Sequence, residues 1–337
     1  MTQQSSLRIA VLGAGSYGTA LAVHLARMHH EVALWGRNRT EIAQLAKDRE
    51  NKEYLPGCKF PKNLALEPDL RAVVTDAQHL LVAVPSHAFH AVLRQIAPLL
   101  TPGQGIACAA KGLEPETGKL LHEIAEDVLG RDRKFAVISG PTFAKEVGQG
   151  LPTAVTVASR DHAFAETIAA ALHGGGFRAY TSDDVIGVEV GGSVKNVLAI
   201  GVGASDGLGL GANTRAMMLT RGLAEIMRLG EALGGRRETF MGLAGFGDLV
   251  LTCTDNQSRN RRLGLAVAQG KTVDEALAEI KQVVEGVRVA PEVLRLAKRL
   301  GVEMPITEQV VRVLRGEVTP LEALRALATR PQRAEAE

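Results

Sequence analysis

An α/β fold is predicted for the first half of the chain and an all-α fold for the second half, on three observations. A glycine-rich turn, GAGSYG (13–18), directly follows the first apolar run. Short apolar runs then alternate with helical patterns as far as about residue 185, and only helical patterns occur beyond it. We therefore expect an N-terminal Rossmann-type domain, doubly wound around a mostly parallel sheet, over 1–187. An all-helical domain should follow over 188–330, and a disordered tail over 331–337.

The predicted strands are continuous apolar runs without the polar alternation of a one-sided sheet. Such runs, when helices separate them, are typical of a parallel sheet covered on both faces. In chain order they are RIAVL (8–12), EVALW (31–35), HLLVAV (79–84), GIACAA (105–110), FAVIS (135–139), TAVTVAS (153–159) and FRAYTS (177–182). The helical patterns between them lie at 17–28, from Thr40, at 87–100, at 117–130 and from about Asp161.

The second half shows helical periodicity and signals for helix starts. The segment NTRAMMLTRGLAEIMRLGEALG (213–234) predicts a long amphipathic helix. Two further starts are marked by capping-box spacing, the second of them with proline at the first helical position: Thr272 with Glu275, and Thr319-Pro320 with Glu322. The substrate-binding part of the chain is therefore expected to be a bundle of helices.

The composition is that of a globular protein without a strongly charged surface. The 337 residues are ample for two domains, with 46% hydrophobic residues, 23% charged residues and a net charge of +2. So small a net charge gives no support for a nucleic-acid or membrane-surface partner. We see no apolar run of the roughly 18 residues that a membrane span needs. The N-terminal residues also lack a signal-peptide pattern.

The cysteines and histidines favour a reducing compartment and give no metal site. Cys58, Cys108 and Cys253 are odd in number, far apart and in no C-x-x-C pair, so we expect a cytoplasmic protein without disulfides. His87 and His90 could share a helix face, but no carboxylate cluster accompanies them. An apolar helical half is compatible with a homodimer, although the sequence does not fix the oligomeric state.

The glycine-rich turn has the spacing of a dinucleotide site. Gly13, Gly15 and Gly18 fit G-x-G-x-x-G between a strand and a helix, whose first N–H groups and dipole attract phosphates. At the end of the second strand, an NAD-selective site usually has Asp or Glu, but this chain has Arg37. A guanidinium group suits a 2′-phosphate. We therefore expect NADPH in preference to NADH; the alternative is that Arg37 is a solvated loop residue.

Three loops at the carboxyl ends of predicted strands could face the ligand crevice. AVPSHAF places a Pro-Ser turn after one strand, and AAKGLE places the cation Lys111 after another. SGPTFAKE follows a third strand and contains Gly140, Thr142 and Ala144. Each loop alone is more often an ordinary connection. Three of them at equivalent ends of one sheet indicate a binding site.

The helical half begins with an apolar segment that contains a lysine. EVGGSVKNVLAIGVGAS (189–205) predicts a buried helix of small residues, with Lys195 and Asn196 in its middle. Burying a charge without a partner is costly, so one interpretation is that Lys195 extends to water along its own stem. The other is that its small neighbours let a ligand and the sheet domain approach it closely.

Two later stretches carry polar groups suited to a small anionic substrate. GLAGFGDLVLTCT holds a single acid, Asp248, among glycines and apolar residues. TDNQSRNRRLG brings Ser258, Arg259 and Asn260 to a predicted helix start, where a hydroxyl, a guanidinium group and an amide suit a phosphate. Of the next two arginines, 261 and 262, we expect one or the other to lie on a solvated helix face.

These motifs also occur together and in one order: GAGSYGTALA, VPSH, KGLE, ISGPTFAKE, GGSVKNVLAIG, GFGDLVLTCT and TDNQSRNRR. The set closely resembles the bacterial NAD(P)-dependent sn-glycerol-3-phosphate dehydrogenases, over essentially the whole chain apart from its last residues. The VKNV and SRNRR blocks are specific to that family. GGSVKN and GFGD differ slightly from the commoner GGAxKN and GLGD, which puts no residue role in doubt.

The resemblance implies the reduction of dihydroxyacetone phosphate to sn-glycerol 3-phosphate, which supplies glycerophospholipid synthesis. It implies Lys195 as proton donor or acceptor, with Lys111 and Asp248 as further catalytic residues. The positions implied to line the substrate are Lys111, Gly140, Thr142, Lys195, Asp248, Ser258, Arg259 and Asn260. Those implied to contact the nucleotide, besides Gly13, Gly15 and Gly18, are Ser16, Tyr17, Arg37, Lys111, Ala144, Arg259, Val283 and Glu285.

Two other functions share part of the pattern. A β-hydroxyacid or 6-phosphogluconate-type dehydrogenase would share the fold plan and a lysine like Lys195, but TDNQSRN does not suit the carboxylate of its substrate. A redox sensor that binds NADPH and signals through a partner would keep GAGSYG, yet would not need Lys195, Asp248 and the SRN cluster together. Turnover of dihydroxyacetone phosphate with NADPH separates these alternatives.

Overall fold

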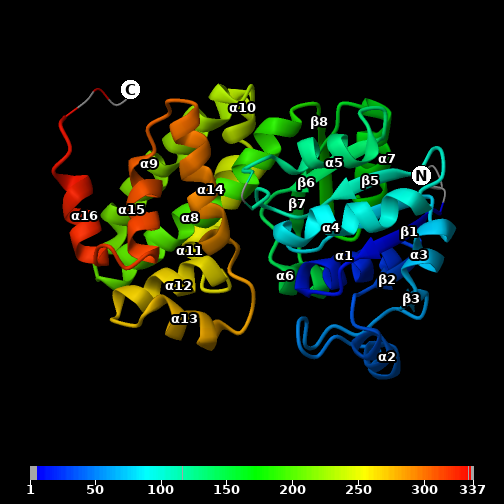
Figure 1. The fold of residues 1–337 in the computed structure, drawn as a ribbon. Helices are drawn as coiled ribbons and strands as arrows, with labels where there is room; N and C mark the ends of the chain where they lie inside the picture. The colour runs from blue at the N-terminus through cyan, green and yellow to red at the C-terminus, as the bar shows by residue number, and fades with distance from the viewer. Residues whose placement is uncertain (1–5, 116, 333, 335–337) are drawn as a thin grey trace.

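A computed structural model describes residues 6–115, 117–332 and 334 of the chain. Of the tail 331–337, which the sequence predicts to be disordered, residues 333 and 335–337 lie outside the described part. The described chain forms a half built around a sheet and a helical half, which lie side by side (Figure 1).

One eight-stranded sheet forms the centre of the N-terminal half, in the order β3-β2-β1-β4-β5-β6-β7-β8. All neighbouring strands are parallel except β6 and β7, which are antiparallel. The strands are β1 (Arg8–Leu12), β2 (Glu31–Trp35), β3 (Leu64–Leu66), β4 (His79–Val82), β5 (Gly105–Cys108), β6 (Phe135–Ser139), β7 (Thr153–Ala158) and β8 (Phe177–Ser182). The predicted mostly parallel sheet is confirmed. Strand β3 was not predicted, because three residues are too few to give an apolar run.

Helices cover both faces of the sheet, as the continuous apolar strands require. Alternate residues of β1 enter different core clusters: Ile9 and Val11 join one, Ala10 and Leu12 the other. The first cluster is covered by α1 (Ser16–Arg27), α6 (Ala144–Gln149) and α7 (His162–Leu172), and the second by α3 (Leu70–Asp76), α4 (Ser86–Ile96) and α5 (Leu121–Leu129). Helix α2 (Arg39–Asp48) and the short turn η1 (Ala97–Leu99) complete this half.

The described part of the C-terminal half contains helices and no strand, as predicted. Its elements are α8 (Val185–Gly207), α9 (Gly211–Ala232), α10 (Arg237–Phe240), the π-helical turn η2 (Leu243–Gly247), α11 (Asp248–Thr254), α12 (Arg259–Ala268), α13 (Val273–Ile280), α14 (Glu285–Arg299), α15 (Pro305–Leu314) and α16 (Pro320–Ala328). Both predicted capping boxes are present, at the starts of α13 and α16.

Helix α8 packs into both halves. Val185 and Val188 contact Val137 and Ala158 of the sheet, whereas the residues from Val190 onward form the centre of the helical core. A division after residue 187 would therefore pass through the first turn of α8.

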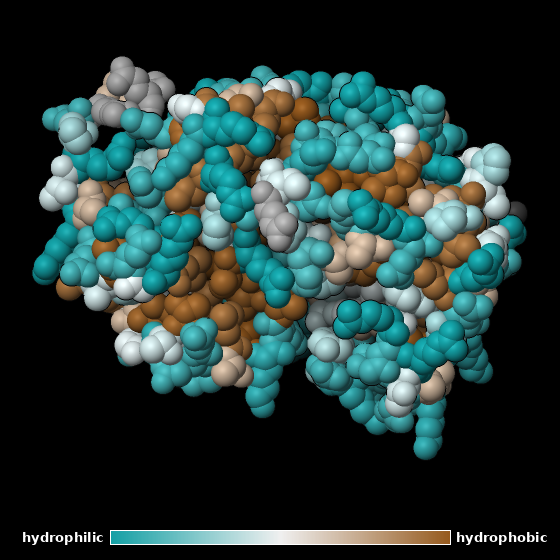
Figure 2. All heavy atoms as spheres, in the orientation of Figure 1, coloured by the Kyte–Doolittle hydropathy of each residue, from teal (hydrophilic) through white to brown (hydrophobic). Residues whose placement is uncertain are grey.

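By length and composition, α8 could also cross a membrane, since an 18-residue window of it has a mean hydropathy of 1.5. The expectation that no segment is so apolar was therefore wrong. However, 89% of that window is buried inside the protein, so α8 has the burial of a core helix. The visible face of the molecule carries hydrophilic side chains interrupted by hydrophobic ones (Figure 2).

Candidate active site

The glycine-rich turn joins β1 to α1 as the sequence predicts. Gly13 has a φ of 122°, and a Cβ there would lie 2.7 Å from the carbonyl oxygen of Ala83 at the end of β4. A Cβ on Gly18 would collide with the carbonyl of Gly13, so this glycine lets α1 pack against the turn. A Cβ on Gly15 would meet nothing within 4 Å. The N-terminus of α1, which begins with Ser16, therefore has open space in front of it for a phosphate group.

Arg37 lies two residues after the end of β2 and is exposed. Its charge helps to lower the pKa of His87 in the first turn of α4, after burial and together with Arg288 of α14. Glu285, the first residue of α14, acts on the same histidine in the opposite sense. Arg37 and Glu285, which are far apart in the sequence, therefore both lie near His87.

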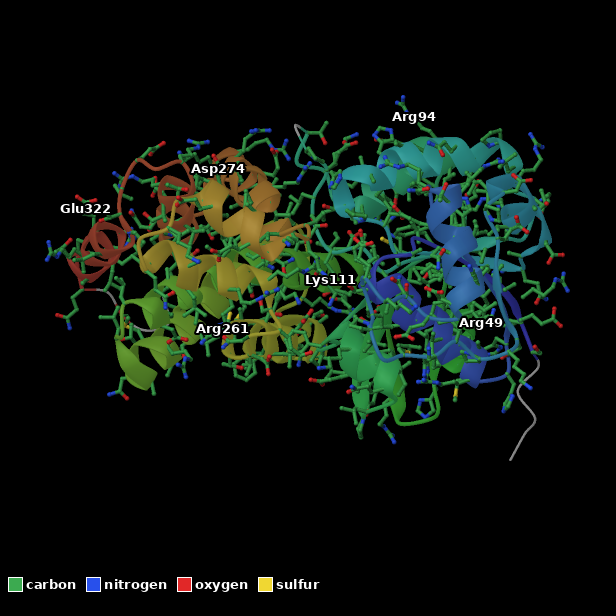
Figure 3. The ribbon with its side chains drawn as sticks, turned by 90° about the horizontal axis from the view of Figure 1, so that it is seen from below. Arg49, Arg94, Lys111, Arg261, Asp274 and Glu322 are labelled. Atoms are coloured by element: carbon green, nitrogen blue, oxygen red, sulfur yellow. The ribbon has the colours of Figure 1, made fainter. Side chains whose placement is uncertain are left out.

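At the junction of the halves, one carboxylate holds two lysines. Asp248 accepts a hydrogen bond from Lys111 Nζ at 2.7 Å through Oδ2, and one from Lys195 Nζ through Oδ1. Asp248 is 1% exposed and Lys195 5% exposed, so this is a buried cluster. Lys111 comes from the loop after β5 and lies between the two halves (Figure 3). The cluster holds two cations and one anion, which leaves positive charge for an electron-rich oxygen.

Glycines allow the three residues to meet. A Cβ on Gly192 would lie 2.5 Å from Ser139 Oγ and 3.7 Å from Lys111 Cγ. A Cβ on Gly191 would lie 2.5 Å from the carbonyl oxygen of Ala244 in η2. The predicted close approach of the sheet to α8 is thus confirmed, and η2 places Asp248 at the start of α11, where the helix dipole favours a carboxylate.

The two ammonium groups differ in acidity. Burial lowers the pKa of Lys195 to about 8, with Asp248 opposing and Lys111 reinforcing the effect. Burial also acts to lower the pKa of Lys111, but the carboxylate of Asp248 outweighs it and the pKa is raised. Lys195 is therefore the group that loses a proton first as the pH rises, while it is still largely protonated at neutral pH.

The loop after β6 contacts the same cluster. The carbonyl oxygen of Gly140 accepts a hydrogen bond from Lys111 Nζ at 3.0 Å. Thr142 Oγ1 donates to that carbonyl at 3.0 Å and lies 3.2 Å from the hydroxyl of Tyr17. Lys111 Nζ lies 5.8 Å from the centroid of the Tyr17 ring. These contacts connect the glycine-rich loop to the lysines. Ala144 is the first residue of the next helix, α6.

The start of α12 carries the second polar group of residues. Ser258 caps the helix through the backbone N–H of residue 261, and Asn260 donates to Asn196 Oδ1 at 2.9 Å. Asn260 Oδ1 accepts from the backbone N–H of Gly286, also at 2.9 Å. Since Asn196 is the residue after Lys195, this network fixes the start of α12 beside the lysine. Burial lowers the pKa of Arg259, and the charge of Glu285 counteracts it.

The two arginines that follow behave differently. Arg262 is exposed, as expected for one of the pair, but Arg261 is buried. Its guanidinium group binds Asp206, Asn256 and the carbonyl oxygen of Cys253. Arg261 therefore joins α8 to α12, and the solvated helix face belongs to Arg262.

Sequence reasoning missed two contacts of the site. Thr252 Oγ1 accepts a hydrogen bond from Lys195 Nζ at 2.9 Å and lies one helical turn after Asp248. The i, i+4 spacing of this threonine and the acid could have identified it. Ser86 of α4 donates to Glu285 of α14 at 2.9 Å and so joins the two halves; no local pattern predicts a pair so far apart in the chain.

Two further points from the sequence are the nucleotide contact expected of Val283 and the expected absence of a metal site near His90. Val283 is 37% exposed in the segment before α14. His90 pairs with Glu114, and no group of three or more His, Cys, Asp or Glu side chains that could hold a metal ion occurs among the described residues.

Comparisons with known proteins agree with this geometry. Residues 8–165 match the family model for the NAD-dependent glycerol-3-phosphate dehydrogenase N-terminus, and residues 184–325 match that for its C-terminus. The chain is 56% identical over 328 residues to a glycerol-3-phosphate dehydrogenase [NAD(P)+] of Pseudoalteromonas translucida, covering 97% of this chain and 98% of that one. The same identity over 330 residues relates it to the Aeromonas salmonicida protein, covering 98% and 99%.

A solved structure gives the same result. The crystal structure of glycerol-3-phosphate dehydrogenase from Coxiella burnetii superposes with a TM-score of 0.93 at 47% identity, covering 96% of this chain and 99% of that one. A Rossmann-like half, a helical half and a lysine cluster at their junction define a nucleotide-dependent oxidoreductase. The chain belongs to the NAD-dependent glycerol-3-phosphate dehydrogenase family.

Proposed function

We propose that the protein catalyses the reversible, NAD(P)H-dependent reduction of dihydroxyacetone phosphate to sn-glycerol 3-phosphate. The observation that carries the proposal is the carboxylate of Asp248, which binds the ammonium groups of both Lys111 and Lys195 at the junction of the two halves. The product is the backbone that glycerophospholipid synthesis uses. A carboxylate-recognising dehydrogenase receives no support from the Ser258–Asn260 cluster.

The residues of the cluster divide the work of ketone reduction. When bound, the nicotinamide nucleotide supplies the hydride for the carbonyl carbon. Lys195 donates a proton to the carbonyl oxygen, and in the reverse direction its neutral form accepts that proton. Lys111 stabilises the negative charge that develops on this oxygen. Asp248 holds both ammonium groups in place and offsets one of their charges.

Arg259 and Asn260 anchor the phosphate group. They lie at the start of α12, where backbone N–H groups and the helix dipole favour an anion. Anchoring the phosphate orients the carbonyl for reaction, so its binding energy contributes to catalysis as well as to affinity. Gly140, Thr142 and Ser258 line the remainder of this site.

The test compares dihydroxyacetone phosphate with dihydroxyacetone, which lacks the phosphate. We expect the parent enzyme to reduce the phosphorylated ketone with NADPH or NADH and to reduce the other poorly. Arg259→Ala should raise KM and lower kcat for dihydroxyacetone phosphate, and should hardly change the rate with dihydroxyacetone. Equal losses on both substrates would mean that Arg259 supports the fold or the nucleotide instead.

The nucleotide site fits a dinucleotide, and we propose a preference for NADPH. Gly15 leaves open space before α1, Gly13 and Gly18 allow close packing at the turn, and Ser16 and Tyr17 form the first turn of α1. Arg37, exposed at the end of β2, suits a 2′-phosphate. The remaining contacts are assigned to Lys111, Ala144, Arg259, Val283 and Glu285.

We further propose a cytoplasmic protein that forms a homodimer. Cys58, Cys108 and Cys253 are free thiols, as suits a reducing compartment. Two large hydrophobic side chains of the helical half, Met217 and Met241, are more than half exposed. Sedimentation equilibrium of the purified enzyme measures the oligomeric state.

A further inference from the structure

One buried ion pair outside this site joins the two halves of the molecule. Glu189 on α8 and His122 on α5 are 5% and 6% exposed. Glu189 Oε1 accepts the backbone N–H of His122 at 2.9 Å, and Oε2 accepts its ring Nδ1 at 2.5 Å. Because both oxygens bind one residue, the carboxylate fixes the start of α5 in position and in direction relative to α8.

The charges around the pair favour its ionised form. Burial acts to lower the pKa of His122, but the hydrogen bond and the charge of Glu189 outweigh it, so the pKa is raised. Glu123, next on α5, acts in the same direction, and Arg160, before α7, opposes it. The carboxylate also lies at the N-terminal turn of α5, where the helix dipole favours negative charge.

The pair connects the two segments that carry the catalytic lysines. Helix α5 follows the loop that starts with Lys111, and Glu189 precedes Lys195 on α8 by six residues, about 9 Å along the helix axis. Cys108 lies three residues before Lys111, and its pKa is raised first by burial and then by the charge of Glu189. Glu189 therefore contacts the end of this loop at His122, and its charge acts on Cys108, before the other end.

Stability alone gives no reason for charges at this place. A well-packed apolar pair of similar volume is often as stable as a buried ion pair, because each charge must be desolvated. What an apolar pair lacks is a directional hold on α5. We propose that Glu189 is a positioning residue, which through His122 holds the Lys111 loop and α8 in the one register that lets both ammonium groups reach Asp248. This inference rests on the proposed reaction and adds to it a residue that acts through the lysines.

The first test is Glu189→Gln, which keeps the shape and one acceptor but removes the charge. We expect kcat to fall about 10- to 100-fold, since small displacements of reacting groups have effects of that size. KM for the nucleotide should stay within twofold, because the glycine-rich turn is not involved. The matched control is Glu123→Gln, which removes an exposed carboxylate that binds the backbone N–H of Leu120 at the same helix end. It should leave kcat unchanged.

A second readout does not depend on turnover. An NMR titration of the lysine Nζ signals reports the pKa of Lys195 without a reagent having to reach this buried group. Burial lowers that pKa to about 8 in the parent protein. The charge of Asp248 raises the pKa of Lys195. If Glu189→Gln loosens the contact between the two groups, the pKa of Lys195 should fall in that variant and stay constant in Glu123→Gln. If the parent did not reduce dihydroxyacetone phosphate, the proposed function would fail, and this measurement would still decide the role of Glu189.

A double variant separates positioning from stability. His122→Leu with Glu189→Leu should fold with a melting temperature near that of the parent, yet should show the same loss of kcat as Glu189→Gln. A parent-like kcat and Lys195 pKa in either variant would overturn the proposal and leave the pair a structural role. If the single variant does not fold, the double variant decides alone.

Discussion

At the scale of single residues, Lys195 tests the proposed chemistry most directly. Lys195→Met keeps the length and most of the apolar stem, so folding and nucleotide affinity should hardly change. Removing the proton donor should lower kcat by about 10²- to 10⁴-fold, the usual contribution of general acid–base catalysis. Steady-state kinetics and a nucleotide titration of this one variant are sufficient. If kcat stayed within a few-fold of the parent, Lys195 would be a packing residue that happens to be charged.

Arg37 decides the choice of nucleotide. Arg37→Asp should repel the 2′-phosphate of NADPH and offer an acceptor to the 2′-hydroxyl of NADH. Loss of a charge-assisted contact costs on the order of 1.5–3 kcal/mol, so NADPH affinity should fall roughly 10- to 100-fold. The ratio of kcat/KM for the two nucleotides measures the change. Arg39→Asp, an exposed neighbour in α2, is the control, and an unchanged ratio in Arg37→Asp would contradict the assignment.

The roles of single residues could be predicted from the sequence where a short, continuous motif defines them. Gly13, Gly15 and Gly18 lie in the predicted turn, because a strand, a glycine spacing and a helix start agree within a few residues. The surroundings of a single side chain could not be predicted in the same way. Arg261 is buried because Asp206, 55 residues away, neutralises it, and no local pattern reports such a partner.

At the scale of elements, the contact of α8 with β6 depends on one missing methyl group. Alanine normally favours a helix interior over glycine by about 1 kcal/mol, but a Cβ on Gly192 would lie 2.5 Å from Ser139 Oγ. We therefore expect Gly192→Ala to destabilise the protein by about 1–3 kcal/mol and to lower kcat by displacing Lys111. Thermal unfolding and kinetics measure both effects.

A second substitution provides the control for this clash. Ser139 Oγ has no hydrogen-bond partner among the described residues, and Ser139 Cβ would lie 3.4 Å from the new methyl group. Ser139→Ala alone should therefore change stability little. Combined with Gly192→Ala, it should restore most of the stability that Gly192→Ala loses. No recovery in the double variant would place the strain elsewhere in α8.

Element prediction succeeded where the chain has strong start signals. The capping boxes at Thr272 and Thr319 begin α13 and α16 at the expected residues. Strand β3, which pairs with β2 at the edge of the sheet, gave no signal because its three residues are too few to form an apolar run. The π-helical turn η2 was visible only as an excess of glycine, since its shape depends on packing against α8 and α10.

At the scale of the whole molecule, stability should depend on pH through two buried histidines of the sheet half. His30 Nδ1 accepts the backbone N–H of Leu7 at 3.1 Å, and Nε2 binds the carbonyl oxygen of Ala171 at 3.1 Å, so its ring is neutral in the fold. Burial lowers the pKa of His30 and of His24. A lowered pKa in the folded state means that the unfolded chain binds the proton first. Stability is therefore fully present above about pH 6.5 and is lost as the pH falls below it.

The measurement is the melting temperature between pH 7.5 and pH 5, in the parent and in two variants. When His30 is protonated, its Nδ1 carries a hydrogen and can no longer accept the Leu7 N–H. The loss of this hydrogen bond should lower the stability of the fold by roughly 1–3 kcal/mol. His30→Gln should lower stability at neutral pH and flatten the dependence on pH. His162→Gln, at an exposed position on α7 whose charge does not act on His24 or His30, should leave the dependence as it is. A parent curve that is flat over this range would contradict the prediction.

The layout of the whole molecule followed from the alternation of apolar runs and helices, but the meeting of its parts did not. Lys111 and Asp248 are 137 residues apart, and His122 and Glu189 are 67 apart. Such pairs depend on how the helical half docks on the sheet. That docking depends on the close contacts that Gly191, Gly192 and Val188 make with the other elements. The periodicity of the sequence does not report these contacts.

Helix α8 also determines where the chain can be cut. Val185 and Val188 fill a socket in the sheet half, and the residues from Val190 onward fill the centre of the other half. A fragment that ends at residue 187 would lack Val188 and so leave this socket in the sheet half partly open to water. The complementary fragment would lack the first turn of its central helix. The two halves have different architectures, yet we expect neither to fold when it is expressed alone, because one helix of 23 residues packs into both.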